Sequence, residues 1–108
     1  MAFLSQQEAV FALARFLSTT PQYRELKDAT SAVRQKPELF KALSDFKAMS
    51  SSGQFSPEQG ERVGREYQRL IRIAELARYF RASDKFAEVI GSILGEVNAM
   101  LESSLGLH

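Results

Sequence analysis

Two parallel rows of apolar residues, here called files, run along the C-terminal third of the sequence and constrain its fold more than any other feature. One file has the alternating spacing of four and three residues that defines a heptad repeat: Leu76, Phe80, Ser83, Ala87, Ile90, Leu94, Val97 and Leu101. The second file lies beside the first at sevenfold spacing: Tyr79, Phe86, Ile93 and Met100. Both continue without interruption through Ser83 and Asp84, so the pattern predicts a single helix from about residue 76 to 103.

Small residues form a third file on the same predicted helix, spaced four apart: Ser83, Ala87, Gly91, Gly95 and Ala99. Such a ridge lets a second helix approach closely. Each interior glycine costs about 1 kcal/mol relative to alanine, so a close contact would offset a real penalty. A helix crossing inside the monomer and a dimer seam explain the ridge equally well.

The two apolar files together are wider than one packing partner requires, which favours a homodimer. The predicted seam combines apolar and small positions: Leu76, Phe80, Ala87, Ile90, Gly91, Leu94, Gly95, Val97 and Leu101. Replacing Gly91 by leucine should therefore push the partner helix away.

Capping signals divide the remaining sequence into further helices. Ser5 with Glu8, Thr20 with Pro21, and Ser56 with Pro57 and Gln59 mark three helix starts. Pro37 ends the second helix near Gln35 and Lys36, and serines 50 to 52 with Gly53 mark a loop. Residues expected to face inward are Val10, Leu13, Ala14 and Leu17 in the first helix, Leu26, Ala29, Thr30 and Val33 in the second, and Leu39, Phe40, Leu43 and Phe46 in the third.

No segment shows the alternation of a strand, so the prediction is an all-α bundle of four to five helices in one domain spanning residues 1–108. The file Val63, Tyr67, Leu70 and Ala74 is not continued by Leu76. This slip in register predicts a kink or a short break near residues 74 to 77.

Composition excludes several classes of function. Fourteen basic and thirteen acidic side chains nearly cancel, so the whole molecule is no general polyanion binder. The absence of cysteine excludes disulfides, thiolate catalysis and cysteine-ligated metal sites. No run approaches the ~20 apolar residues of a membrane span. The first seventeen residues lack the basic start of a targeting segment, and a cytoplasmic location is expected.

Catalytic patterns are weak. Ser44 and Lys47 have the S-x-x-K spacing of serine acyl enzymes, but the companion motifs are missing. The single histidine is His108. Glu58, Glu61 and Glu66 could bind a divalent ion, yet carboxylates near a helix start are favourable without one. We therefore expect no enzyme activity, no cofactor and no metal.

Arginines form a stripe on the predicted helix that follows Pro57. Arg62, Arg65, Arg69 and Arg72 share one face, and Arg78 and Arg81 continue the basic character. Acids four residues before Arg62 and Arg65 partly neutralise them, so a solvated face is the first interpretation. The alternatives are a surface for an acidic protein partner, made of Arg65, Arg69, Arg72, Arg78 and Arg81, and an RNA-binding stripe across residues 62–81. Lipid binding by the first helix is poorer, because its polar face is weakly basic.

Two stretches resemble the YlbF/YmcA/YheA family of small bacterial helical proteins. They read LARFLSTTPQYRELKDATSAVRQKPELFKALSDF and EYQRLIRIAELARYFRASDKFAEVIGSILGEVNAML, and the resemblance runs from about Ala9 to Leu105. It implies an all-helical, commonly dimeric regulatory or adaptor protein that is not an enzyme. Some members are associated with competence, sporulation and biofilm control, and with complexes that modulate ribonuclease Y and mRNA processing.

One departure limits what the resemblance implies. Certain YlbF-type members have a cysteine-containing tail linked to iron–sulfur clusters, and this chain contains no cysteine. It is more similar to the short YheA-like members.

Overall fold

The computed structural model describes residues 5–51 and 56–106, and within these ranges the chain forms five helices and no strand. The helices are α1 (Gln6–Leu17), α2 (Pro21–Arg34), α3 (Pro37–Ser50), α4 (Pro57–Leu70) and α5 (Ala74–Ser104). The predicted all-α class is confirmed. The predicted loop begins later than serine 50, which is the last residue of α3, and Ser52 and Gly53 lie outside the described residues.

The capping residues define the starts of α1, α2 and α4 as the sequence predicts. The Ser5 hydroxyl accepts from the Glu8 amide, and the Thr20 hydroxyl accepts from the Tyr23 amide. At α4 the capping box is reciprocal, because Ser56 accepts from the Gln59 amide while the Gln59 side chain accepts from the Ser56 amide.

The break before the long helix lies earlier than predicted. The helical pattern stops after Leu70 and resumes at Ala74, so residues 71–73 form the turn and the predicted position of 74–77 is wrong. Neither glycine nor proline occurs there, and Ile73 caps α5 without a side-chain hydrogen bond. Leu70 and Leu76 flank the turn, and both are fully buried. We infer that burial of these two side chains sets the position of the break. The uninterrupted helix through Ser83 and Asp84 is confirmed.

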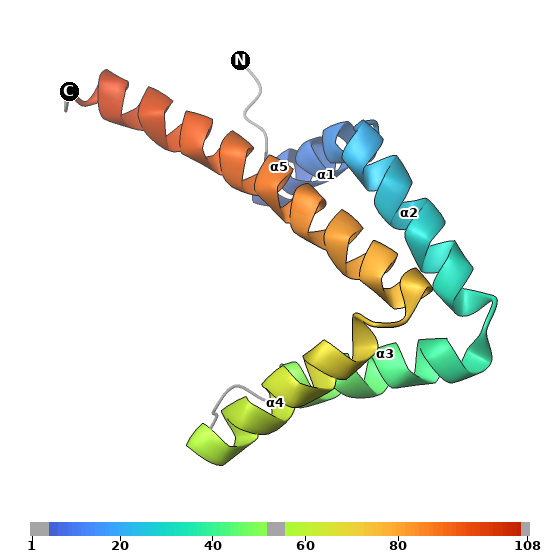
Figure 1. Cartoon of the computed structure of the whole chain (residues 1–108). Coiled ribbons are helices and arrows are strands. Elements are labelled where there is room, and N and C mark those ends of the chain that lie inside the picture. The colour runs from blue at the N-terminus through green and yellow to red at the C-terminus, as the bar shows by residue number, and fades with distance from the viewer. Residues whose placement is uncertain (1–4, 52–55, 107–108) are drawn as a thin grey trace.

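The helices form two arms joined at one end (Figure 1). In one arm α2 packs along the first half of α5, and in the other α3 packs along α4. The core lies where the arms meet, and its buried residues come from all four of these helices: Ala29, Val33, Leu43, Phe46, Leu70, Leu76, Tyr79 and Ala82.

An aromatic cluster joins three helices at this corner. The ring centroids of Phe46 (α3), Tyr67 (α4) and Phe80 (α5) lie 5.1 to 6.1 Å apart, and Tyr79 packs 5.6 Å from Phe80. Edge-to-face rings at these distances add stability beyond their buried area. Ion pairs from Lys36 to Glu75 and from Arg78 to Glu25 connect α5 to the segment before α3 and to α2.

Two predicted core assignments are wrong for the single chain. α1 has no buried residue, and Val10, Leu13 and Ala14 are exposed although the pattern places them inward. Phe40 of α3 is also exposed, because it lies outside the face of α3 that packs against α2 and α4. The Arg34 guanidinium lies over its ring. The reason is shared: periodicity identifies an apolar face, but a neighbouring helix must be in reach to bury it.

The open shape leaves a large surface uncovered. The radius of gyration is 18.0 Å, whereas a compact domain of this length has about 13 Å. The accessible surface is 8472 Å², against about 6,000 Å² for a compact monomer of this mass. This excess is larger than the roughly 800 Å² that each partner loses in a typical stable complex.

Candidate interaction surfaces

The second half of α5 presents an uncovered apolar face. It projects past the beginning of α2 (Figure 1), so its apolar residues are not buried within the chain. We call this surface the distal apolar face, and it consists of Leu94, Val97, Met100, Leu101 and Leu105. Met100 is 74% exposed and Leu101 57% exposed. No charged residue belongs to this face, which makes it suited to contact with another apolar surface.

The predicted seam residues therefore fall into two groups. Leu76 is buried in the core, and Phe80 and Ile90 are partly buried by other parts of the same chain. Leu94, Val97 and Leu101 of the same heptad file are exposed. One continuous heptad pattern thus begins in a contact inside the chain and ends on an exposed surface.

α1 presents a second uncovered apolar surface. Its exposed apolar residues are Val10, Phe11, Leu13 and Phe16. An isolated helix of 12 residues is only marginally stable in water, so α1 needs tertiary contacts to remain helical. The inward-facing residues expected for the first helix did not include Phe11 or Phe16. Both belong to the same broad apolar surface of α1 as Val10 and Leu13.

The glycines of α5 lie in open space. A Cβ atom added at Gly91 or Gly95 would meet nothing within 4 Å in the described part of the chain. The small-residue ridge therefore has no intramolecular helix packed on it at these two positions. At ~100° per residue, Gly95 lies about 160° around the helix from Val97, whereas Gly91 lies about 60° from Leu94, so Gly95 faces away from the distal apolar residues and Gly91 borders them.

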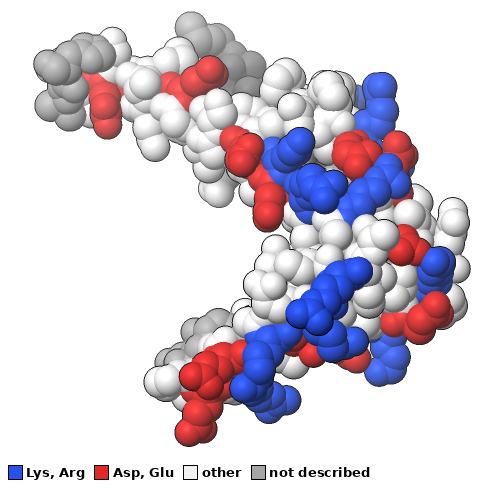
Figure 2. All heavy atoms as spheres, in the orientation of Figure 1, with Lys and Arg blue, Asp and Glu red and all other residues white. Residues whose placement is uncertain are grey.

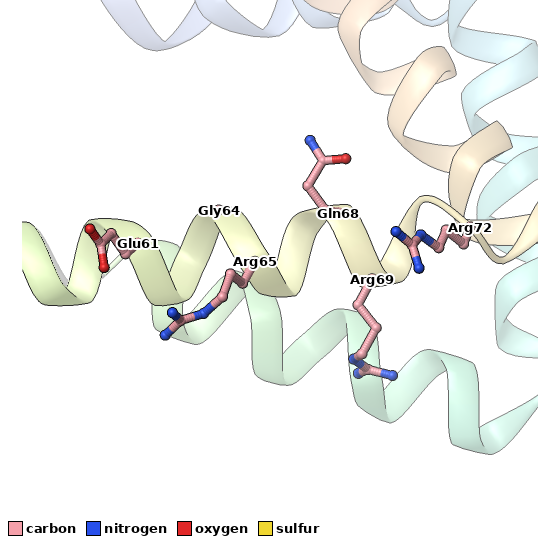
Figure 3. A pocket seen from close by; sticks show the side chains of 6 residues that line it. All are labelled: Glu61, Gly64, Arg65, Gln68, Arg69 and Arg72. Carbon is pink, nitrogen blue, oxygen red and sulfur yellow. The ribbon is translucent and has the colours of Figure 1, made fainter.

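The arginines of α4 line a shallow, open hollow of about 640 Å³ on one helix face, together with Glu61, Gly64 and Gln68 (Figure 3). The three arginines in it are Arg65 and Arg69 of α4 and Arg72 of the turn that follows α4. A band of basic side chains runs along the arm of α4, with acidic side chains at its end (Figure 2). Gly64 was not singled out from the sequence, although a glycine at an exposed position inside a helix is itself an unusual signal.

The arginines of the predicted surface differ in whether they form ion pairs. Arg69 donates from Nε to both Glu66 oxygens at 3.2 Å, and Arg78 is bidentate to Glu25 at 2.8 and 2.9 Å. Within the described residues, Arg65, Arg72 and Arg81 have no ion pair within 4 Å. The structure thus brings Arg65, Arg69 and Arg72 together and places Arg78 in a contact between α2 and α5.

The ion pairs also shift the acidity of their carboxyls. The hydrogen bond from Arg78 holds the pKa of Glu25 below its ordinary value of 4.5, and Arg81 adds a weaker effect in the same direction. The Lys36 ammonium lowers the pKa of Glu75 in the same way, and Arg69 lowers that of Glu66. These carboxyls contribute stability above about pH 4.5 that is lost as the pH falls through their lowered pKa values.

Replacing Arg78 by glutamine should therefore reduce the acid sensitivity of the fold. The loss of Tm between about pH 6 and pH 3 should be smaller in this variant than in the parent, because the pKa of Glu25 then differs less between the folded and unfolded states. The change is modest, since both side chains are about half exposed. Arg65→Gln is the matched control because Arg65 has no ion pair, and an equal change in both variants would contradict the assignment.

The described residues offer little for catalysis or metal binding. Ser44 and Lys47 are exposed on α3, and no group of three or more histidine, cysteine or carboxylate side chains is placed to hold a metal within 5–51 and 56–106. His108 lies outside the described residues. None of the described helices has an apolar stretch that could cross a bilayer.

Comparison with known families agrees with this architecture. The sequence profile of the family described as "Control of competence regulator ComK, YlbF/YmcA" matches residues 7–105, which is nearly the whole chain. The chain belongs to the YlbF/YmcA family. No curated protein and no solved structure gives a significant match. Membership fits a regulatory role for this YlbF/YmcA protein, and the resemblance inferred from its sequence is confirmed.

Proposed function

We propose that this protein is a non-enzymatic regulatory adaptor that works as a homodimer in the cytoplasm. The observation that carries the proposal is the uncovered apolar surface of α1 and distal α5. Ten large apolar side chains of the described residues are exposed, and nine of them lie on these two helices or directly after α5. A solvent-exposed apolar surface of this extent is typical of a protein–protein interface.

A second copy is the partner that best fits the distal apolar face. The face is about ten residues long and uncharged, so two copies related by a twofold axis would meet without opposing like charges. The excess accessible surface also exceeds the area that a standard interface needs from each partner. With the pair formed through distal α5, the exposed apolar surface of α1 stays accessible to other proteins, which is what an adaptor requires.

The regulatory part of the proposal is supported by the family. Its description concerns control of the competence regulator ComK. For this chain we propose action through protein contacts in a regulatory complex of bacterial development or mRNA processing, as the resemblance implies. The shallow arginine hollow and the family's description as a control of a regulator support binding over chemistry.

Light scattering after size exclusion tests the dimer directly. We expect twice the chain mass of 12.1 kDa at both low and high salt, because apolar burial is not screened by ions. A monomer at tens of micromolar protein under both conditions would contradict the proposal.

A further inference from the structure

The arginine hollow of α4 contains cations that the chain itself does not neutralise. Arg65 of α4 and Arg72 of the turn after α4 are seven residues apart, with Gln68 between them, and neither has an ion pair within the described residues (Figure 3). Gly64 lies beside Arg65 in the same hollow, and a Cβ added there would meet nothing within 4 Å. The missing side chain lets another helix approach the α4 backbone closely, so that the long arginines can reach around it.

α5 presents a surface of opposite charge and similar shape. Glu88, Gly91, Gly95 and Glu102 are spaced three, four and seven residues apart, which places them on one helix face. Residues 86–106 contain three glutamates and neither lysine nor arginine. Both glycines of this face are open to a second backbone. We call it the glutamate–glycine face, and at ~100° per residue its centre lies well around the helix from the centre of the distal apolar face.

The two surfaces belong to different arms of the chain. In Figure 2 a band of basic side chains lies over one arm, with acidic side chains at the end of that arm. Toward the free end of the other arm the charged side chains are acidic, and open space separates the two arms. α4 and α5 are not a major packing pair in the fold. Within one chain, the arginine hollow and the distal half of α5 therefore do not pair with each other.

We propose that the α4 arginine hollow of one copy binds the glutamate–glycine face of α5 in a second copy. The inference rests on the proposed self-association and adds a charged contact to the apolar one. Under a twofold axis the contact occurs twice, with each α4 facing the partner's α5, and the assembly closes. Arg65 and Arg72 would pair with Glu88 and Glu102, while the glycines of both helices allow the backbones to approach.

A second copy fits this hollow better than a nucleic acid does. Glu61 lines the hollow and Glu66 holds Arg69, so a phosphate backbone would meet carboxylates among the arginines. The nearby aromatic rings pack against the core, since Tyr67 contacts Phe46 and Phe80, and their partial burial leaves little surface for base stacking. A protein helix with two widely spaced glutamates presents fewer negative charges than a phosphate backbone, so it can pair with Arg65 and Arg72 while meeting less repulsion from these carboxylates.

Charge reversal and charge exchange test the contact. We would measure self-association by sedimentation velocity at about 50 mM and about 500 mM sodium chloride for three variants: Arg65→Glu with Arg72→Glu, Glu88→Arg with Glu102→Arg, and all four changes in one chain. We expect each double variant to raise the dissociation constant by about tenfold or more at low salt, and the quadruple variant to recover most of the loss. Arg62→Glu with Glu58→Arg is the matched control on α4, outside the hollow, and should change little.

The outcomes separate this contact from the apolar dimer. A parent protein that dimerises while neither double variant weakens association would overturn the inference and leave the dimer intact. A quadruple variant as weak as the double variants would overturn it too, because the charges would not face each other. A monomeric parent at both salt concentrations would overturn both proposals.

RNA binding is the remaining outcome and is measured separately. A fluorescent single-stranded uridine 20-mer is titrated with the parent and with the Arg65→Glu, Arg72→Glu variant. Binding that the variant loses, with unchanged self-association, would reassign the hollow to nucleic acid and overturn the inference. Weak, variant-independent binding would support it.

Discussion

Replacing Val97 and Leu101 by aspartate should convert the proposed dimer to a folded monomer. Both side chains lie on the distal apolar face and contribute nothing to the core of the single chain. In a dimer seam the two carboxylates would lose water without gaining a partner, at a cost of several kcal/mol. We expect the dissociation constant to rise at least about a hundredfold, which corresponds to about 2.7 kcal/mol. Light scattering and sedimentation measure the mass, and circular dichroism measures the helix content.

The matched control puts the same charges elsewhere on the same helix. Ser92→Asp with Ser103→Asp adds two aspartates at exposed positions outside both the distal apolar face and the glutamate–glycine face. This variant should remain dimeric. A Val97, Leu101 variant that dimerises as tightly as its parent would move the interface away from distal α5, and α1 would be the next surface to test.

Truncating Leu76 to alanine should destabilise the fold more than any surface change. Leu76 is fully buried where the two arms meet, in a core of only eight buried residues. A buried leucine-to-alanine change costs about 2 to 5 kcal/mol, because the lost apolar contacts leave a cavity. Since small domains have total stabilities of about 5 to 15 kcal/mol, this variant should approach unfolding near room temperature. Urea denaturation followed at 222 nm measures the free energy of unfolding.

The control for this prediction makes the same substitution on an exposed leucine. Leu94 is 52% exposed, so Leu94→Ala in the Val97→Asp, Leu101→Asp background should cost less than about 1 kcal/mol. Using the monomeric background removes the contribution of dimerisation. Equal losses at Leu76 and Leu94 would mean that the corner core does not dominate the stability of the chain.

Local features made most of the helices predictable. The caps at Ser5, Thr20 and Ser56 depend only on residues within four positions along the chain, so they can be recognised from the sequence. The helix starts that they predict are confirmed. The heptad file likewise predicted the uninterrupted α5. The break at residues 71–73 was misplaced because no local signal marks it, and its position depends on the burial of Leu70 and Leu76 on either side.

The interaction surfaces were predictable only as lists of residues. The sequence predicted an arginine surface from Arg65 to Arg81, but Arg78 turned out to be paired with Glu25 on a helix 53 residues earlier in the chain. A contact between positions this far apart produces no periodic pattern. Likewise the spacing of Gly91 and Gly95 could not distinguish a helix crossing inside the monomer from an open surface. The structure shows open space at both glycines.

The amino-acid sequence alone determined that the chain is helical, where most helices begin, which family it belongs to and which faces are apolar. Those properties depend on neighbours within one or two helical turns, or on the whole pattern at once. The tertiary structure decided which apolar faces are covered and which arginines are neutralised. Both depend on which helices pack together, because α2 covers the first half of α5 and brings Glu25 to Arg78. The same heptad file is therefore core at Leu76 and open surface at Leu101.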